Sequence, residues 1–290
     1  MTFDAAVSAT WGTALAELRD KVSGMANWSL TDDPSGGAAE LATGDSFVLR
    51  TSTPSEDIRF EVTAGGGLRI EHGPTYDAAG DAWTDRFSYD PAAVEDLHNN
   101  EDYTVFPASA DGSLGMSDSG TYWLEYVDRG FCFYWQREAG DGDDEDCWVG
   151  ATSVTKAWDY TTAASREAEN VLGFGDSRRG EQRLIHMSES GTGETPNESY
   201  RAGNNSYDGR GLVNPDSNLD NYPLTNTIVS SSVYRTSGQE DAVIGDFDLW
   251  FGDISGAETG HKDLIQDGSQ TDLYTILKRQ GTPAIGMRMD

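Results

Sequence analysis

The densest group of side chains that could bind a metal ion lies in one acidic loop. Residues 141–146 read Asp-Gly-Asp-Asp-Glu-Asp, which places carboxylates at neighbouring and alternate positions. Hard oxygen ligands of this kind suit a structural Ca²⁺, Mg²⁺ or Na⁺ ion. The candidate ligands are Asp141, Asp143, Asp144 and Asp146. An EF-hand is not indicated, because no glycine and distal glutamate follow at the required positions. The alternative is a solvated hairpin tip, and no other cofactor is expected.

The two cysteines, Cys132 and Cys147, lie at opposite ends of a stretch that reads as strand, loop and strand. A hairpin of this shape could place them opposite each other, and a disulfide would then need Cα atoms within about 7 Å. Synthesis in a cytosol favours free thiols instead. A zinc site is not expected, since no CxxC pair or nearby histidine completes a ligand set.

Aromatic residues crowd the same region, and both faces of the segment FCFYWQ carry large apolar side chains. One explanation is a strand that is buried on both faces. The other is a subunit interface or a sugar-stacking platform, because exposed aromatic patches mark binding surfaces. The candidate residues for such a surface are Trp11, Trp123, Tyr134 and Trp135.

Catalytic patterns are weak in this sequence. The four histidines are scattered, and no HExxH, GxSxG, P-loop or Rossmann fingerprint is present. Glycoside hydrolysis needs only two carboxylates, but nothing selects a pair among fifty acidic residues. We therefore do not expect an enzyme, and a secreted or cell-bound hydrolase is the least favoured hypothesis.

The charge balance indicates the solvent. The chain has four lysines, sixteen arginines and fifty acidic residues, with a formal net charge of −30. Self-repulsion of this size destabilises a compact state, but at about 1 M salt the Debye length is only about 3 Å. The balance therefore favours a protein of concentrated brine, with an ordinary acidic protein or a disordered acidic chain as alternatives. Eight Trp, twelve Tyr and ten Phe argue against disorder. Nucleic acid and anionic membranes are not expected as partners, because both require basic patches.

The elements that must position these residues are mostly strands. Apolar residues near the start recur at spacings of three and four, which predicts one amphipathic helix that Thr2 or Asp4 caps and Gly24 ends. These apolar residues are Phe3, Val7, Trp11, Leu15, Leu18 and Val22. Short alternating segments bounded by Gly, Pro, Ser and Asp then predict strands. These segments are 46–51, 57–63, 68–73, 84–90, 121–128, 131–138, 147–161, 183–188, 227–236, 242–253, 262–269, 271–280 and 283–290. Short helices are predicted at 91–101 and 161–173.

We expect a mainly β protein, a β-sandwich or jelly-roll-like fold with an N-terminal amphipathic helix and a smaller C-terminal β unit. The predicted parts are the helix at 1–30, a main β domain at 31–175, a loop-rich connector at 176–225 and a C-terminal β unit at 226–290. The connector is assigned from its content of Gly, Ser, Asn, Asp and Pro.

Four segments carry a resemblance to a known class of protein: GDSFVLRT, EYVDRGFCFYWQREAGDGDD, TKAWDYTTAASRE and KDLIQDGSQTDLYTILKRQGTPAIGMRMD. Together with the N-terminal helix, they resemble a virion structural protein of a tailed virus that infects haloarchaea, of the tail or baseplate type. The resemblance implies a β-rich, non-catalytic subunit of a homo-oligomeric ring or other symmetric assembly. It would be made in the host cytoplasm, bind other virion proteins and act in assembly and host attachment. The alternative is a capsid-vertex or tail-tip protein that recognises a host surface glycan.

Overall fold

The structure is a computed structural model of the chain. It describes the backbone of residues 2–53, 55–85, 104–106, 115–138, 146–153, 155–156, 167–176, 181–188, 198–201, 225–230, 242–252, 262–267, 270–278 and 284–288. Side chains are described within residues 7–53, 55–84, 115–138 and 147–153.

The N-terminal segment contains a strand followed by a helix, so the predicted start of the helix is wrong. Strand β1 covers Thr2–Thr10 and helix α1 covers Trp11–Ser23. Thr10 is the N-cap, and its hydroxyl accepts a hydrogen bond from the Thr13 backbone N–H at 3.2 Å. Gly24 is the C-cap, as predicted. The apolar spacing of four residues at the start was misleading, because it fits two strand periods as well as one helical turn.

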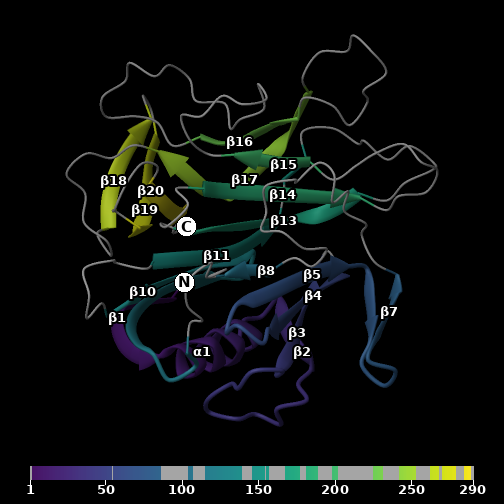
Figure 1. The fold of residues 1–290 in the computed structure, drawn as a ribbon. Helices are drawn as coiled ribbons and strands as arrows, with labels where there is room; N and C mark the ends of the chain where they lie inside the picture. The colour runs from purple at the N-terminus through teal and green to yellow at the C-terminus, as the bar shows by residue number, and fades with distance from the viewer. Residues whose placement is uncertain are drawn as a thin grey trace.

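The largest sheet has seven strands, and every pair of neighbours in it is antiparallel (Figure 1). Its order is β1, β9 (Ser119–Val127), β10 (Gly130–Arg137), β11 (Asp146–Ser153), β13 (Glu167–Asp176), β14 (Glu181–Ser188) and β15 (Glu198–Arg201). The segments predicted at 121–128 and 131–138 are β9 and β10, and a tight turn at Asp128 and Arg129 joins them into a hairpin.

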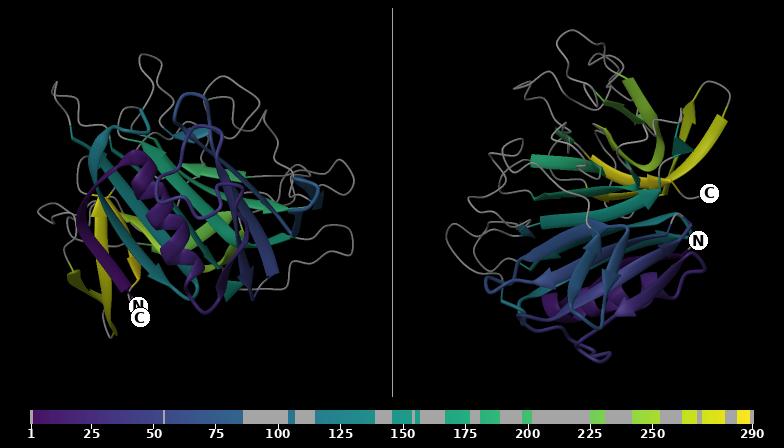
Figure 2. Two further views of the ribbon diagram at one scale, coloured as in Figure 1. Left: turned by 90° about the horizontal axis from the view of Figure 1, so that it is seen from below. Right: turned by 90° about the vertical axis from the view of Figure 1, so that its right-hand side faces the viewer.

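One face of this sheet packs against α1 and a five-stranded antiparallel sheet (Figures 1 and 2). The order of the five strands is β2 (Trp28–Asp32), β3 (Ser46–Ser52), β4 (Ser55–Val62), β5 (Leu68–Gly73) and β8 (Thr104–Phe106). Trp11 stands at the centre of the core, with its ring centroid 5.1 Å from that of Trp135. Its indole N–H donates to the Gly66 carbonyl at 2.8 Å, which fixes the start of α1 to the β4–β5 turn.

The other face of the seven-stranded sheet contacts the C-terminal strands, through β9 and β10 against β19 and β20. These belong to a six-stranded antiparallel sheet, which lies above the seven-stranded sheet in Figure 1. The order is β12 (Thr155–Lys156), β17 (Ala242–Gly252), β20 (Ala284–Arg288), β19 (Gln270–Lys278) and β18 (Lys262–Asp267), and β16 (Thr225–Ser230) pairs with β17. A separate two-stranded sheet holds β6 (Thr75–Asp77) and β7 (Ala82–Asp85).

The prediction of a mainly β protein with a short N-terminal helix is confirmed for the described residues. The helix predicted at 161–173 is wrong from residue 167 onward, because β13 occupies Glu167–Asp176 between β11 and β14. Helix propensity is weak enough for two neighbouring strands to override it. The helix predicted at 91–101 lies outside the described residues. The domain division stays a prediction, although the seven-stranded sheet draws strands from three of its four parts. No helix in the described part of the chain is long and apolar enough to cross a membrane.

Candidate functional site

The structure does not test the ion site predicted at 141–146, because most of its residues lie outside the described part of the chain. Asp141, Asp143 and Asp144 lie outside the described residues, and Asp146 is described only as the first backbone position of β11. Within the described residues, no group of three His, Cys, Asp or Glu side chains could hold a metal ion. An ion at 141–146 therefore stays a prediction.

The aromatic candidates for a glycan platform or an interface are buried within the chain in this structure. Trp11, Tyr134 and Trp135 are each 1% exposed, and Trp123 is 9% exposed. Strand alternation sends Trp135 toward α1, while Tyr134 lies on the opposite face of the sheet, 5.2 Å from Trp123 between ring centroids. The other explanation from the sequence, a strand buried on both faces, is the one that the structure supports.

The cysteines are both free and buried, so of the two alternatives from the sequence the structure has the free thiols and not the disulfide. Cys132 is opposite Gly150, and Cys147 is opposite Trp135, so the two residues are three positions out of register. An odd offset also sends them to opposite faces of the sheet. Burial raises the pKa of the Cys132 thiol well above its usual range, and the neighbouring Glu125 carboxylate adds to the increase.

Charged side chains gather instead on the face of the five-stranded sheet that points away from the core. This outer-face ion-pair cluster consists of Arg50, Asp57, Arg59, Glu61, Arg69 and Glu71. Each arginine lies beside a carboxylate, mostly on an adjacent strand, and such cross-strand pairs are an ordinary source of sheet stability.

The pairs within this cluster are close and partly buried. Both oxygens of the fully buried Asp57 carboxylate accept from Arg50, at 2.7 Å from Nε and 2.5 Å from Nη2. Arg59 donates to Glu61 at 2.5 Å and to Glu71 at 3.1 Å. Burial alone would lower the pKa of Arg59, but the hydrogen bond to Glu61 raises it above its ordinary value. Arg59 therefore stays charged, and because its ion pairs are partly buried, salt screens their attraction less than that of exposed pairs.

Tyr76, in β6, contacts the outer-face ion-pair cluster through Asp57 and Arg59. The Arg59 guanidinium lies 5.9 Å from the centroid of its ring, and the Tyr76 hydroxyl donates to Asp81. Burial raises the pKa of Tyr76 to about 12, and the hydrogen bond to Asp81 adds to the effect. Burial, with the charge of Asp81, also raises the pKa of Asp32 at the end of β2. Asp81 has a φ of 47°, a left-handed conformation that aspartate tolerates better than most residues.

A second polar group is enclosed between the sheets. His72 and Glu56 are each 0% exposed, and their Nε2 and Oε2 atoms lie 2.9 Å apart. Thr51, from the adjacent strand β3, donates to the Glu56 backbone carbonyl at 3.4 Å. The pair resembles part of a catalytic arrangement in its residue types, but complete burial separates it from solvent. A structural role at the end of β4 and β5 fits its position best.

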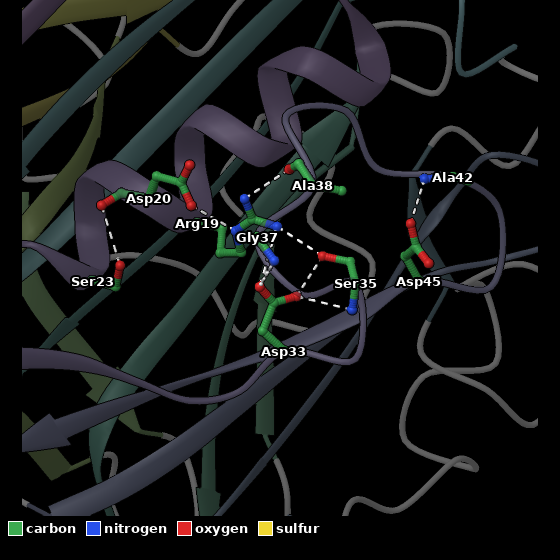
Figure 3. A network of polar contacts seen from close by, with 9 residues as sticks. All are labelled: Arg19, Asp20, Ser23, Asp33, Ser35, Gly37, Ala38, Ala42 and Asp45. Atoms are coloured by element: carbon green, nitrogen blue, oxygen red, sulfur yellow. Dashed lines mark hydrogen bonds and ion pairs between the residues drawn. The ribbon is translucent and has the colours of Figure 1, made fainter.

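Arg19 is the centre of the polar network in Figure 3, and its side chain is 0% exposed. Its guanidinium donates to Asp20 at 2.6 Å, to the Ser35 hydroxyl at 2.9 Å and to the Ala38 carbonyl at 2.8 Å. Burial alone would lower the pKa of Arg19, but the hydrogen bond and charge of Asp20 raise it. One helical residue therefore fixes the 33–38 loop on α1.

Asp33 organises the same loop from the other side. Its Oδ1 accepts from the Ser35 N–H at 3.1 Å, its Oδ2 accepts from the Gly37 N–H at 2.8 Å, and Oδ2 lies 3.4 Å from the Arg19 guanidinium. The loop is thus built around one carboxylate and one guanidinium. These contacts are internal, so the arrangement stabilises the loop and leaves little of either charge for a ligand.

Sequence reasoning missed all three of these polar groups. A usable signal existed for the outer-face cluster, because Arg50, Arg59 and Arg69 each alternate with core residues in consecutive strands. Arg19 gave no such signal, since a charged residue within a helical stripe is usually exposed. Searches of protein-family models, curated proteins and solved structures find no match to this chain.

Proposed function

We propose that this chain is a structural subunit of a halophilic tailed-virus particle, a tail or baseplate component that acts in assembly and host attachment. The proposal places the protein in the virion, after synthesis in the host cytoplasm, in contact with other virion proteins and with copies of itself. It requires no cofactor.

The proposed adaptation to high salt is supported by the pairing of arginine side chains with carboxylates. Arg19, Arg50, Arg59, Arg69 and Arg137 each lie within 4 Å of a carboxylate. Arg19 is fully buried, and the other four are between 14% and 35% exposed. Because these five arginines are paired within the chain, they add little positive charge to its surface. With a net charge of −30, we infer a surface on which carboxylates are in excess. Concentrated salt screens such a surface.

The sheets support the part of the proposal that concerns architecture. We infer a β-sandwich, because the inward faces of the seven-stranded and five-stranded sheets supply one continuous apolar core. The contacts of β10 with β19 and β20 add a further layer. Close-packed protein interiors deform little, and such a core suits a particle subunit that must keep its shape across many copies.

The glycan-binding alternative loses its main support. It relied on exposed aromatic side chains, whereas Trp123 and Trp135 are buried within the chain. We therefore do not assign receptor binding to these residues.

The proposal is tested on particles. The gene neighbourhood is first inspected for tape-measure, portal and baseplate genes, and an antibody against the purified chain is then applied to virus particles banded in high salt. The expected result is co-sedimentation with particles and labelling confined to the tail. A chain that forms no defined multimer and is missing from the particle band is not a virion subunit.

A further inference from the structure

Strand β1 is an edge strand of the seven-stranded sheet in the described part of the chain. It pairs with β9 alone among the described strands. The outward backbone groups of an edge strand are a ready template for a further strand. Val7 is 36% exposed and Ser8 is also exposed, so the second half of β1 is accessible.

Its length distinguishes β1 from the other edge strands that the structure describes. It has nine residues, whereas β2, β8, β12, β15, β16 and β18 have between two and six. Its sequence TFDAAVSAT contains one charged residue, Asp4. Proteins usually protect sheet edges by shortness, by charged side chains, lysine above all, or by a β-bulge.

The rare lysines make the contrast sharper. The chain has four, and two of them lie in β12 and β18, the strands that end the main path of the six-stranded sheet: Lys156 and Lys262. In β1 the one irregular feature is a register shift between Asp4 and Val7, which leaves Val7–Thr10 in regular pairing with β9. The longest described edge is thus the one with little protection.

Charge decides which partner fits this edge. Two copies of a chain with net charge −30 repel each other, so they can approach only where each surface carries little charge. Asp4 is the single charged residue among the first sixteen, in a chain of which 24% is charged. A basic partner would bind the acidic parts of the surface outside β1. An uncharged strand, such as β1 of a second copy, fits the nearly uncharged edge of β1.

We propose that β1 pairs antiparallel with β1 of a second copy, which joins two seven-stranded sheets into one across a two-fold axis. This deepens the proposed assembly role and rests on it for the choice of partner. A single strand pair buries less than the roughly 1,000 Å² of a stable interface, so the isolated dimer should be weak and concentration-dependent. Salt should strengthen it, because screening reduces the repulsion between copies.

The first experiment is sedimentation velocity of the full chain in 3 M KCl over a wide range of protein concentration. The wild-type chain is expected to shift from monomer to dimer as concentration rises. Val7→Lys adds a charge at the edge and should weaken association at least tenfold. Leu30→Lys is the matched control, since Leu30 is 37% exposed on the edge strand β2, and it should associate like the wild type.

The second experiment identifies the surface that pairs. A spin label on Ser8→Cys reports the distance between copies, and the native thiols should not react because Cys132 and Cys147 are buried. One short distance between labels is expected. A wild-type chain that stays monomeric at every concentration overturns the proposal. So does a multimer with widely separated labels that Val7→Lys leaves intact, although the assembly role would survive that result. Absence from particles would contradict the virion role while leaving β1 pairing in the purified chain unaffected.

Discussion

At the residue scale, Arg19 shows how a charged side chain can serve as core. The guanidinium has partners on the helix and on the 33–38 loop, and no part of the side chain reaches solvent. Removing one partner from a buried ionic network leaves the others desolvated, which costs more than the loss of an exposed pair.

Arg19→Met is therefore expected to lower the free energy of unfolding by about 2–4 kcal/mol. The loss should persist in 3 M KCl, because buried pairs are screened little. Lys21→Met is the control on the same helix, where a pair with Glu17 at 3.3 Å is part-exposed, and it should change stability by at most about 0.5 kcal/mol. Denaturant unfolding of both variants in high salt measures the difference, and equal effects would contradict a central role for Arg19.

Tyr76 gives a second prediction at this scale, through its pKa of about 12. The unfolded chain has a tyrosine pKa of about 10, so folding favours the neutral phenol. That contribution to stability is complete below pH 10 and is lost as pH rises from 10 to 12. Tyr76→Phe cannot ionise and should show a shallower loss of stability over this window. Unfolding curves at pH 9, 10, 11 and 12 compare the two proteins, and parallel slopes would refute the assignment.

At the element scale, the β9–β10 hairpin depends on the close approach of the Gly120 backbone to the Trp135 ring. A Cβ on Gly120 would lie 2.4 Å from the Trp135 ring and 2.5 Å from the Gln136 carbonyl oxygen. Trp135 is packed in the core against Trp11, so its ring has little room to move.

Gly120→Ala is accordingly expected to destabilise the protein by about 1–3 kcal/mol, because overpacking forces the strand or the ring to shift. Gly65→Ala is the matched control in the β4–β5 turn, where an added Cβ meets nothing within 4 Å, and its effect should stay within about 0.5 kcal/mol. Thermal melts in 3 M KCl check both. A neutral Gly120→Ala would mean that Trp135 is more loosely held than its burial indicates.

In the N-terminal segment, the same apolar spacing runs through a strand and a helix. From Trp11 to Ser23 the apolar stripe predicted the helix correctly, because every turn repeats it. Ahead of Trp11, the same spacing of four was compatible with a strand, and pairing with β9 decided the outcome. A period that two structures share cannot choose between them.

At the scale of the whole molecule, the acidic balance predicts stability that depends on salt. The melting temperature is expected to rise between 0.1 M and 3 M KCl, because the Debye length falls from about 10 Å to below about 3 Å over this range. Repulsion among the exposed carboxylates is then screened, whereas the partly buried pairs of the outer-face cluster are retained. Equal melting temperatures at the two salt concentrations would contradict adaptation to brine.

The sequence by itself determined the charge balance, the β-rich class and the positions of most described strands. Charge balance follows from composition, and strands follow from local alternation with turn residues between them. These properties need no knowledge of which segments meet.

Only the tertiary structure decided which faces and edges are covered. It buried the aromatic candidates on both sides of β10, because the C-terminal strands pack on the face opposite α1. It separated Cys132 from Cys147 through strand register, and it enclosed Arg19 within a loop fold. Burial, register and edge position arise from contacts between residues distant in the chain, and no local pattern records them.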